Sequence, residues 1–188
     1  MANTTTMFLV QKARDGDSDA RHQLVVRFYQ DWIDKFHGDL GKTIRKLYDT
    51  QDLVQSALAD ALPKLSTLRN ERVFFTWVTS IIRHKIAAEK RRLRRERPLE
   101  NPRGGSGFDP PAAPSEGQTR ERVEVYLETL DAILALFPEH PEEMAVVVMK
   151  LVDDRPVASI VEFLGIAERT VFLRLQKGLA LLKKKLSP

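Results

Sequence analysis

Apolar residues recur every three or four positions along most of the chain, which is the period of a helix that buries one face. The pattern predicts amphipathic helices over residues 18–36, 50–62, 70–86, 127–137, 141–151, 157–164 and 168–186. Residues 141–151 are rich in valine and would also suit a strand, but Pro141 and the two glutamates after it are typical of a first helical turn. No segment alternates apolar and polar residues with a period of two. The sequence therefore predicts an all-α protein.

The periodic pattern stops between residues 98 and 119, where prolines and glycines concentrate. This segment carries half of the chain's ten prolines. It has too few apolar residues to offset the entropy lost on ordering, so we predict a flexible linker. The expected architecture is two small helical domains, residues 1–97 and 120–188, joined by the linker 98–119.

Residues 156–186 have the pattern of a helix-turn-helix motif. Pro156 suits the first turn of a short helix, Gly165 suits a left-handed C-cap, and a second helix follows the turn. In this motif the second helix enters the major groove of DNA, where its N-terminal residues contact base edges. A three-helix bundle that contains a glycine turn is the alternative, and it requires no DNA.

Phe172 lies outside the apolar face of the last predicted helix, among polar and basic residues. That face is expected to consist of Val171, Leu175, Leu179, Leu182 and Leu186. Arg169 is placed to donate to guanine, and Thr170 or Arg174 to a base or a phosphate. Phe172 would either contact a thymine methyl group or pack against the preceding helix.

The helix predicted from residue 70 leads into a basic segment, residues 83–97, which carries eight lysines and arginines and two glutamates. A surface of nearly one sign repels itself unless an anion binds it. The sequence FFTW precedes this segment, and aromatic rings beside basic residues suit unpaired bases, which stack on the rings. Phe74 and Trp77 follow the inward period and are predicted core residues, so Phe75 is the candidate contact.

The predicted helix at residues 50–62 carries acidic and polar residues outside its apolar stripe, among them Asp52, Gln55 and Asp60. A solvated surface is the simplest interpretation. A docking surface for a basic protein partner is the alternative, and composition alone does not decide between them.

Composition excludes several classes of protein. The chain has 188 residues, a formal net charge of +4 and no cysteine, which excludes disulfides and cysteine-ligated zinc sites. Its four histidines are scattered, and it has no HExxH, P-loop or dinucleotide-binding motif. We therefore expect no catalytic residue, cofactor, metal or small-molecule substrate. It has no membrane-spanning stretch and no signal-peptide pattern, so we expect a cytoplasmic protein.

Three stretches resemble, in this order, bacterial sigma factors of the sigma-70 family, and specifically the small two-domain extracytoplasmic-function (ECF) class. They are YDTQDLVQSALADAL, FFTWVTSIIRHKIAAEKRR and the segment from LALFPEHPEE to the C-terminal lysines. The resemblance implies a non-enzymatic protein that binds core RNA polymerase and directs transcription initiation. It also implies a region 2-like helical bundle before the linker and a region 4-like helix-turn-helix domain after it. The implied partners are core RNA polymerase, promoter DNA and an anti-sigma factor.

The resemblance further implies roles for individual residues. Docking on core polymerase would use Asp52, Leu53, Gln55 and Asp60. Recognition and opening of the promoter −10 element would use Phe75, Arg83, His84, Lys85 and Arg91. Recognition of the −35 element would use Glu168, Arg169, Thr170, Phe172, Arg174 and Lys177. Phe172 and Leu173 replace a Lys-Ser pair that is common in the family, so the resemblance does not imply which promoter sequence is recognised.

The main alternative is a stand-alone helix-turn-helix regulator that does not dock on polymerase. In the sigma-factor interpretation, two modules on one tether bind separated promoter elements and gain from effective concentration. A single globule that sealed both basic surfaces from solvent, with no sign that it can separate, would contradict this interpretation.

Overall fold

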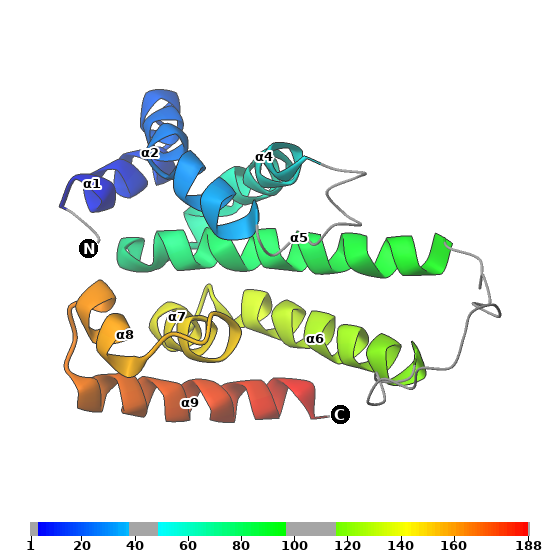
Figure 1. The fold of residues 1–188 in the computed structure, drawn as a ribbon. Coiled ribbons are helices and arrows are strands. Elements are labelled where there is room, and N and C mark those ends of the chain that lie inside the picture. Colours follow the sequence, from blue (N-terminus) through cyan, green and yellow to red (C-terminus); the bar gives the residue numbers. More distant parts are fainter. Residues whose placement is uncertain (1–3, 38–48, 97–115, 188) are drawn as a thin grey trace.

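The computed structural model describes residues 4–37, 49–96 and 116–187, and every regular element within these ranges is helical (Figure 1). The prediction of an all-α protein is confirmed. Residues 98–115 of the predicted linker lie outside the described residues. Among the described helices, none combines the length and the apolar character needed to cross a membrane.

The first half of the chain folds into four described helices and two 3-10 turns. They are α1 (Thr4–Arg14), α2 (Ser18–His37), α4 (Thr50–Ala61), the 3-10 turns η1 (Leu62–Thr67) and η2 (Glu71–Val73), and α5 (Phe74–Glu96). Asp17 Oδ1 accepts a hydrogen bond from the backbone N–H of Ala20 at 2.9 Å. Asn70 Oδ1 accepts one from the N–H of Arg72 at 3.0 Å, so Asn70 caps η2, which leads directly into α5. Helix α1 has no counterpart among the predicted helices.

The second half forms the predicted helix-turn-helix and two helices before it. They are α6 (Glu116–Leu136), α7 (Pro141–Val147), a π-helical segment η3 (Val148–Val152), α8 (Val157–Leu164) and α9 (Glu168–Leu186). Helix α6 begins before the predicted boundary at residue 120. The valine-rich segment is helical, as predicted. Gly165 has a φ of +65° and caps α8 in the left-handed conformation, which favours glycine.

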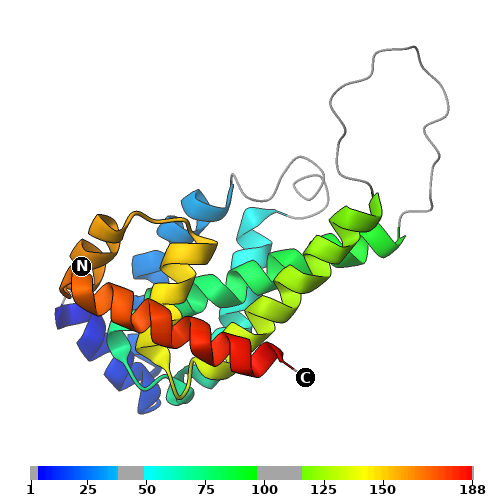
Figure 2. The same ribbon diagram turned by 90° about the horizontal axis from the view of Figure 1, so that it is seen from below.

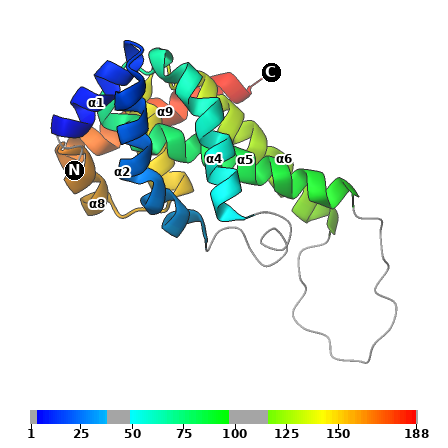
Figure 3. The same cartoon turned by 90° about the horizontal axis from the view of Figure 1, so that it is seen from above.

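Helix α5, the last helix of the first half, lies along the boundary with the second half (Figure 1). Helices α1, α2 and α4 cover one side of it, and α6 to α9 lie on the other side (Figure 3). Helix α6 runs antiparallel to α5, and the two helices share the most extensive contact between elements (Figure 2). The two halves of the chain therefore pack against each other through the long helix that carries the predicted −10 residues.

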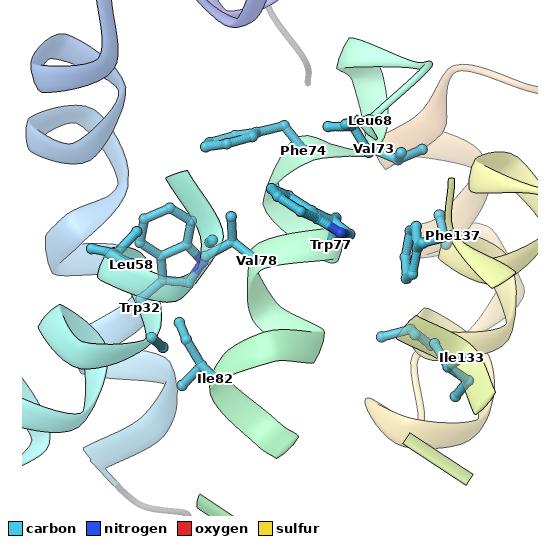
Figure 4. Packing of buried hydrophobic residues seen from close by; sticks show 14 of the residues in the cluster. Trp32, Leu58, Leu68, Val73, Phe74, Trp77, Val78, Ile82, Ile133 and Phe137 are labelled. Carbon is cyan, nitrogen blue, oxygen red and sulfur yellow. The ribbon is translucent and has the colours of Figure 1, made fainter. Parts of the chain in front are cut away.

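One hydrophobic cluster extends through both halves. On the α5 side it contains Trp77 and Ile82, and on the α6 side Ile133 and Phe137, all of them buried (Figure 4). Phe74 is also buried, which confirms the prediction that Phe74 and Trp77 are core residues. In this conformation the two helical segments share a core, whereas two modules with open surfaces are expected from the sequence.

Helix α9 packs against α7 with a face that differs from the predicted one. Val171 and Leu182 are buried as expected, but Leu179 and Leu186 are exposed. Gly178 is buried in their place, and a Cβ there would lie 2.6 Å from Val147 Cγ2. The missing side chain lets the helices approach closely, and this turns the apolar face away from Leu179. The hydrophobic pattern does not show this because glycine carries no apolar side chain.

We predict that Gly178→Ala destabilises the protein by about 1 kcal/mol in chemical denaturation. A glycine-to-alanine change inside a helix normally adds about 0.5–1 kcal/mol of stability, but overpacking a core costs about 1–3 kcal/mol. Val147 is a short, β-branched, buried side chain and cannot swing away from the new methyl group.

The control is the same substitution in a Val147→Ala background, which removes the nearest side-chain atom. There, Gly178→Ala should cost less than it does in the wild-type protein. Equal effects in the two backgrounds would show that the close approach of α7 and α9 is not what selects glycine.

Candidate functional site

The five residues predicted to act at the −10 element all lie on α5, and each has a partner. They are Phe75, Arg83, His84, Lys85 and Arg91. Lys85 is paired within the first half: its Nζ lies 2.6 Å from Asp60 Oδ2 and 3.1 Å from the carbonyl oxygen of Ser56. The other four contact groups from the second half of the chain.

Arg83 binds a carboxylate that is almost fully buried between the halves. Asp153, which follows η3, is 4% exposed, and its Oδ1 accepts hydrogen bonds from Arg83 Nη2 at 2.8 Å and Nε at 3.0 Å. Its Oδ2 accepts a hydrogen bond from Lys35 Nζ of α2 at 2.8 Å, and Arg155 Nε lies 3.8 Å away. One carboxylate thus joins α2, α5 and the loop before α8.

His84 and Arg91 pair with acidic residues of α6. His84 Nε2 lies 2.9 Å from Asp131 Oδ1, a contact that is an ion pair when the imidazole is protonated. Arg91 Nε lies 2.7 Å from Glu124 Oε1, and Arg95 Nη2 lies 3.6 Å from the same oxygen. The basic segment of α5 is therefore neutralised in part by α6, which sequence periodicity does not place beside it.

Phe75 is enclosed by aromatic rings from both halves. It stacks on Trp32 of α2 with a centroid distance of 5.5 Å and an interplanar angle of 9°. Phe163 of α8 lies 6.3 Å from it, tilted by 53°. The Arg155 guanidinium in turn lies over the Phe163 ring at 5.2 Å. Phe75 is thus partly buried instead of presenting a free ring to solvent.

A cleft separates α5 from α6 near the His84–Asp131 pair. Its volume is about 620 Å³, and its lining includes Trp77, Ile81 and Leu134 on the apolar side. Asp131 is 66% exposed at its edge. The contact between α5 and α6 is consequently hollow beside the ion pair, whereas Phe137 is fully buried in the shared core.

The residues predicted to act at the −35 element lie along the first turns of α9, and most of them face solvent. Glu168, Arg169 and Lys177 are exposed, and Thr170 is half-buried. Phe172 is 50% exposed, so it does not pack fully against α8. Ala167 precedes the helix and supplies no side-chain cap.

Two basic residues of α9 are held by the start of α7. Arg174 forms an ion pair with Glu142, and Lys177 Nζ lies 2.5 Å from Glu143 Oε1. Burial raises the pKa of Glu143, but the hydrogen bond from Lys177, its own backbone and the charges of Lys177 and His140 outweigh burial and lower the pKa overall. The Glu143 carboxylate is thus ionised at neutral pH. Its contribution to stability is lost only as the pH falls through that lowered value.

The predicted docking residues on α4 divide into exposed and buried positions. Asp52 and Gln55 are exposed, and Gln55 Nε2 donates a hydrogen bond to Tyr29 Oη at 3.0 Å. Asp60 is exposed and pairs with Lys85. Leu53 is buried in the core, which corrects its assignment as a contact residue: its side chain holds α4 in place and does not face a partner.

The sequence does not indicate the residues of the second half that meet α5. Asp153, Asp131, Glu124 and Phe163 are distant from α5 in sequence, and no local pattern distinguishes them from solvated residues. The adjacent acids at 153–154, between two apolar helices, are the one visible signal. Among the described residues there is no group of three or more His, Cys, Asp or Glu arranged to hold a metal ion.

A family model described as ECF sigma factor matches residues 2–187 of the chain. No curated protein matches the sequence.

The Asp153 contacts predict a large effect from a small substitution. Asp153→Asn keeps the shape of the side chain but removes the negative charge that Lys35 and Arg83, both mostly buried, contact together. Removing one partner of a buried ion pair costs about 3–5 kcal/mol, so the free energy of unfolding should fall by up to that amount in chemical denaturation.

Asp154→Asn is the matched control because Asp154 is the adjacent acid and is exposed. Its φ is +48°, a conformation that asparagine adopts readily, so this variant should keep its stability to within about 0.5 kcal/mol. Equal losses in the two variants would mean that the Asp153 contacts do not stabilise the packing of the halves.

Proposed function

Because the chain belongs to the ECF sigma factor family, we propose that it binds core RNA polymerase and brings it to promoters through the two predicted DNA surfaces and the acidic face of α4. Members of this family are non-enzymatic factors that act with RNA polymerase in promoter-specific transcription initiation. The observation that carries the proposal is the family match over residues 2–187, together with a helix-turn-helix whose second helix presents exposed basic and aromatic residues.

The −35 element is proposed to bind the N-terminal turns of α9. Arg169 and Phe172 face solvent there and are available to a major groove without rearrangement. Arg169 would donate to guanine, and the Phe172 ring would contact a thymine methyl group. Arg174 and Lys177 would exchange Glu142 and Glu143 for phosphates or bases, while Thr170 and Glu168 would contact the rim of the groove.

The −10 element is proposed to bind α5. Arg83, His84, Lys85 and Arg91 would contact phosphates and bases of the opened strand, and an unpaired base would stack on Phe75. All five side chains have protein partners in the structure, so this step requires that at least the contacts from the second half be exchanged for DNA.

Core polymerase is proposed to dock on α4 through Asp52, Gln55 and Asp60. Asp52 is exposed in the first turn of the helix, and no other described side chain bonds to it. An acidic, exposed face in a chain of positive net charge is complementary to a basic partner surface.

The docking proposal predicts that Asp52→Lys abolishes promoter-dependent transcription. The protein would be mixed with core polymerase and genomic DNA fragments from its source organism, and the transcripts sequenced. Wild-type protein should give transcripts from defined start sites, whereas Asp52→Lys should give none and still bind the same promoter fragments, because the substitution places like charges at the docking face.

Asp31→Lys on α2 is the control because Asp31 is another exposed acid and its reversal changes the net charge equally. It should leave transcription intact. If wild-type protein binds DNA but never core polymerase, the stand-alone regulator is the better description. Loss of transcription in both variants would remove Asp52 from the docking surface.

The −35 proposal predicts that Phe172 recognises thymine through its methyl group. Replacing the thymines of a mapped −35 element by uracil removes only these methyl groups, and it should weaken binding of wild-type protein by about 1 kcal/mol, the lower end for a base contact. The Phe172→Ala variant should bind the two duplexes equally in a fluorescence anisotropy titration. A variant that still prefers thymine would exclude this role for Phe172.

A further inference from the structure

Helix α2 brings a phenylalanine next to the aromatic residues at the start of α5. Between ring centroids, Phe28 lies 5.5 Å from Phe75, 5.7 Å from Trp32 and 6.0 Å from Phe74. Trp32 and Phe74 are buried, whereas Phe28 and Phe75 are only partly buried. Of these four rings, Phe28 and Phe75 are therefore the two that keep surface for a ligand.

A cation accompanies the Phe28 ring. The Arg27 guanidinium lies over this ring at 5.8 Å from its centroid, and the Arg27 side chain is exposed. Among the described residues no carboxylate forms an ion pair with Arg27, whereas the four cations of the predicted −10 surface on α5 each contact an acid. The charge of Arg27 is therefore available to an anion from solution, beside the face of the ring that opens to solvent.

We propose that Arg27 and Phe28 form a second nucleotide site for the opened promoter strand. One base stacks on Phe28, next to the base on Phe75, and Arg27 binds a phosphate of the same stretch. The inference rests on the function proposed for α5, and it extends the path of the single strand from α5 onto α2.

The arrangement of the two rings suits two neighbouring bases. The planes of Phe28 and Phe75 are inclined to each other by 55°, so one flat base cannot stack on both rings. Their centroid distance of 5.5 Å is within reach of successive nucleotides, which advance about 3.4 Å along the axis in a stacked strand and further in an extended one. A strand that places one base on Phe75 thus brings the next base to Phe28.

Arg27 can exchange the ring for a phosphate at small cost. A contact between a cation and a ring is weak at an exposed position, whereas a phosphate carries full negative charge and accepts two parallel hydrogen bonds from a guanidinium. Movement of the guanidinium to a phosphate also uncovers the ring face for a base. The two adjacent side chains then bind the base and the backbone of one nucleotide.

The proposed site would not select one base. Every base presents a flat face to an aromatic ring, so stacking tolerates any sequence. The nucleotide bound by Phe28 should therefore leave no preferred letter in an alignment of promoters. Its base should nevertheless contribute to the affinity for the strand, and this combination distinguishes a stacked base from one that is read by hydrogen bonds.

The test measures binding of a labelled single strand to the complex of this protein with core polymerase. The probe carries the non-template sequence of a −10 element mapped by the transcription experiment, and an abasic nucleotide replaces each position in turn. Loss of the base on Phe28 should weaken binding by about five-fold or more, the lower end for a stacked base, whereas exchange for another base should have little effect. The position should adjoin the one that Phe75→Leu identifies.

Phe28→Leu keeps an apolar side chain but removes the ring. It should bind the intact strand about five-fold or more weakly and lose the response to the missing base at that one position. A merely loosened fold would weaken binding of all strands and keep this response. Phe28→Tyr is the matched control, because it keeps the ring and should retain both the affinity and the response. A Phe28→Leu variant with the wild-type abasic profile, or equal losses in the two variants, would overturn the inference.

Arg27→Gln tests the phosphate contact at an exposed position, apart from the packing of the core. On single strands each phosphate contact contributes about 0.7 to the slope of log K against log salt concentration. The slope should fall by about this amount in Arg27→Gln. It should stay unchanged in Arg122→Gln, which removes an exposed arginine of α6 with the same change of charge. An unchanged slope in Arg27→Gln, or an equal fall in both variants, would overturn the inference.

The outcome for the proposed function is separate. If the protein directs promoter-dependent transcription with core polymerase while Phe28→Leu and Arg27→Gln bind the strand as wild type does, the sigma-factor proposal stands and the site on α2 is wrong. If wild-type protein neither binds core polymerase nor gives promoter-dependent transcripts, the sigma-factor proposal fails, and the site on α2 fails with it.

Discussion

The buried carboxylate of Asp153 is the interaction on which the arrangement of the molecule depends. An isolated charge is very unfavourable at this depth, so the site exists only because Lys35 and Arg83 converge on it from α2 and α5. The same pairing fixes how the second half lies on the first. It also explains how a strongly basic helix can pack against a hydrophobic core without a nucleic acid bound.

The sequence predicts the individual helices well because their determinants are local. The caps at Asp17 and Asn70, the left-handed turn at Gly165 and the inward period of Phe74 and Trp77 all depend on residues within a few positions of one another. The family resemblance, carried by three separate stretches, agrees with the family match over nearly the whole chain.

What the sequence does not predict is the relation between the halves. The contacts of Arg83 with Asp153 and of Asn70 with Glu142 join residues about seventy positions apart, and neither side shows a pattern that names its partner. The corrected face of α9 has the same origin: close approach at Gly178 depends on Val147 of another helix. Leu53 lies on the apolar face that the helical period of α4 defines, so this period alone indicates that Leu53 is a core residue.

The π-helical turn of η3 affects what happens to Asp153 when a residue is lost from this stretch during evolution. The N–H of Asp153 donates to the carbonyl oxygen of Val148 at 2.9 Å, five residues earlier, so this stretch holds one residue more than an α-helical turn. Loss of a single codon within Val148–Val152 would turn this wide turn into an ordinary one and leave the Asp153 carboxylate close to its present position, because a π-helical turn accommodates its extra residue within the turn. Lineages could therefore gain or lose one residue in this turn and keep the contact that Asp153 makes with α2 and α5.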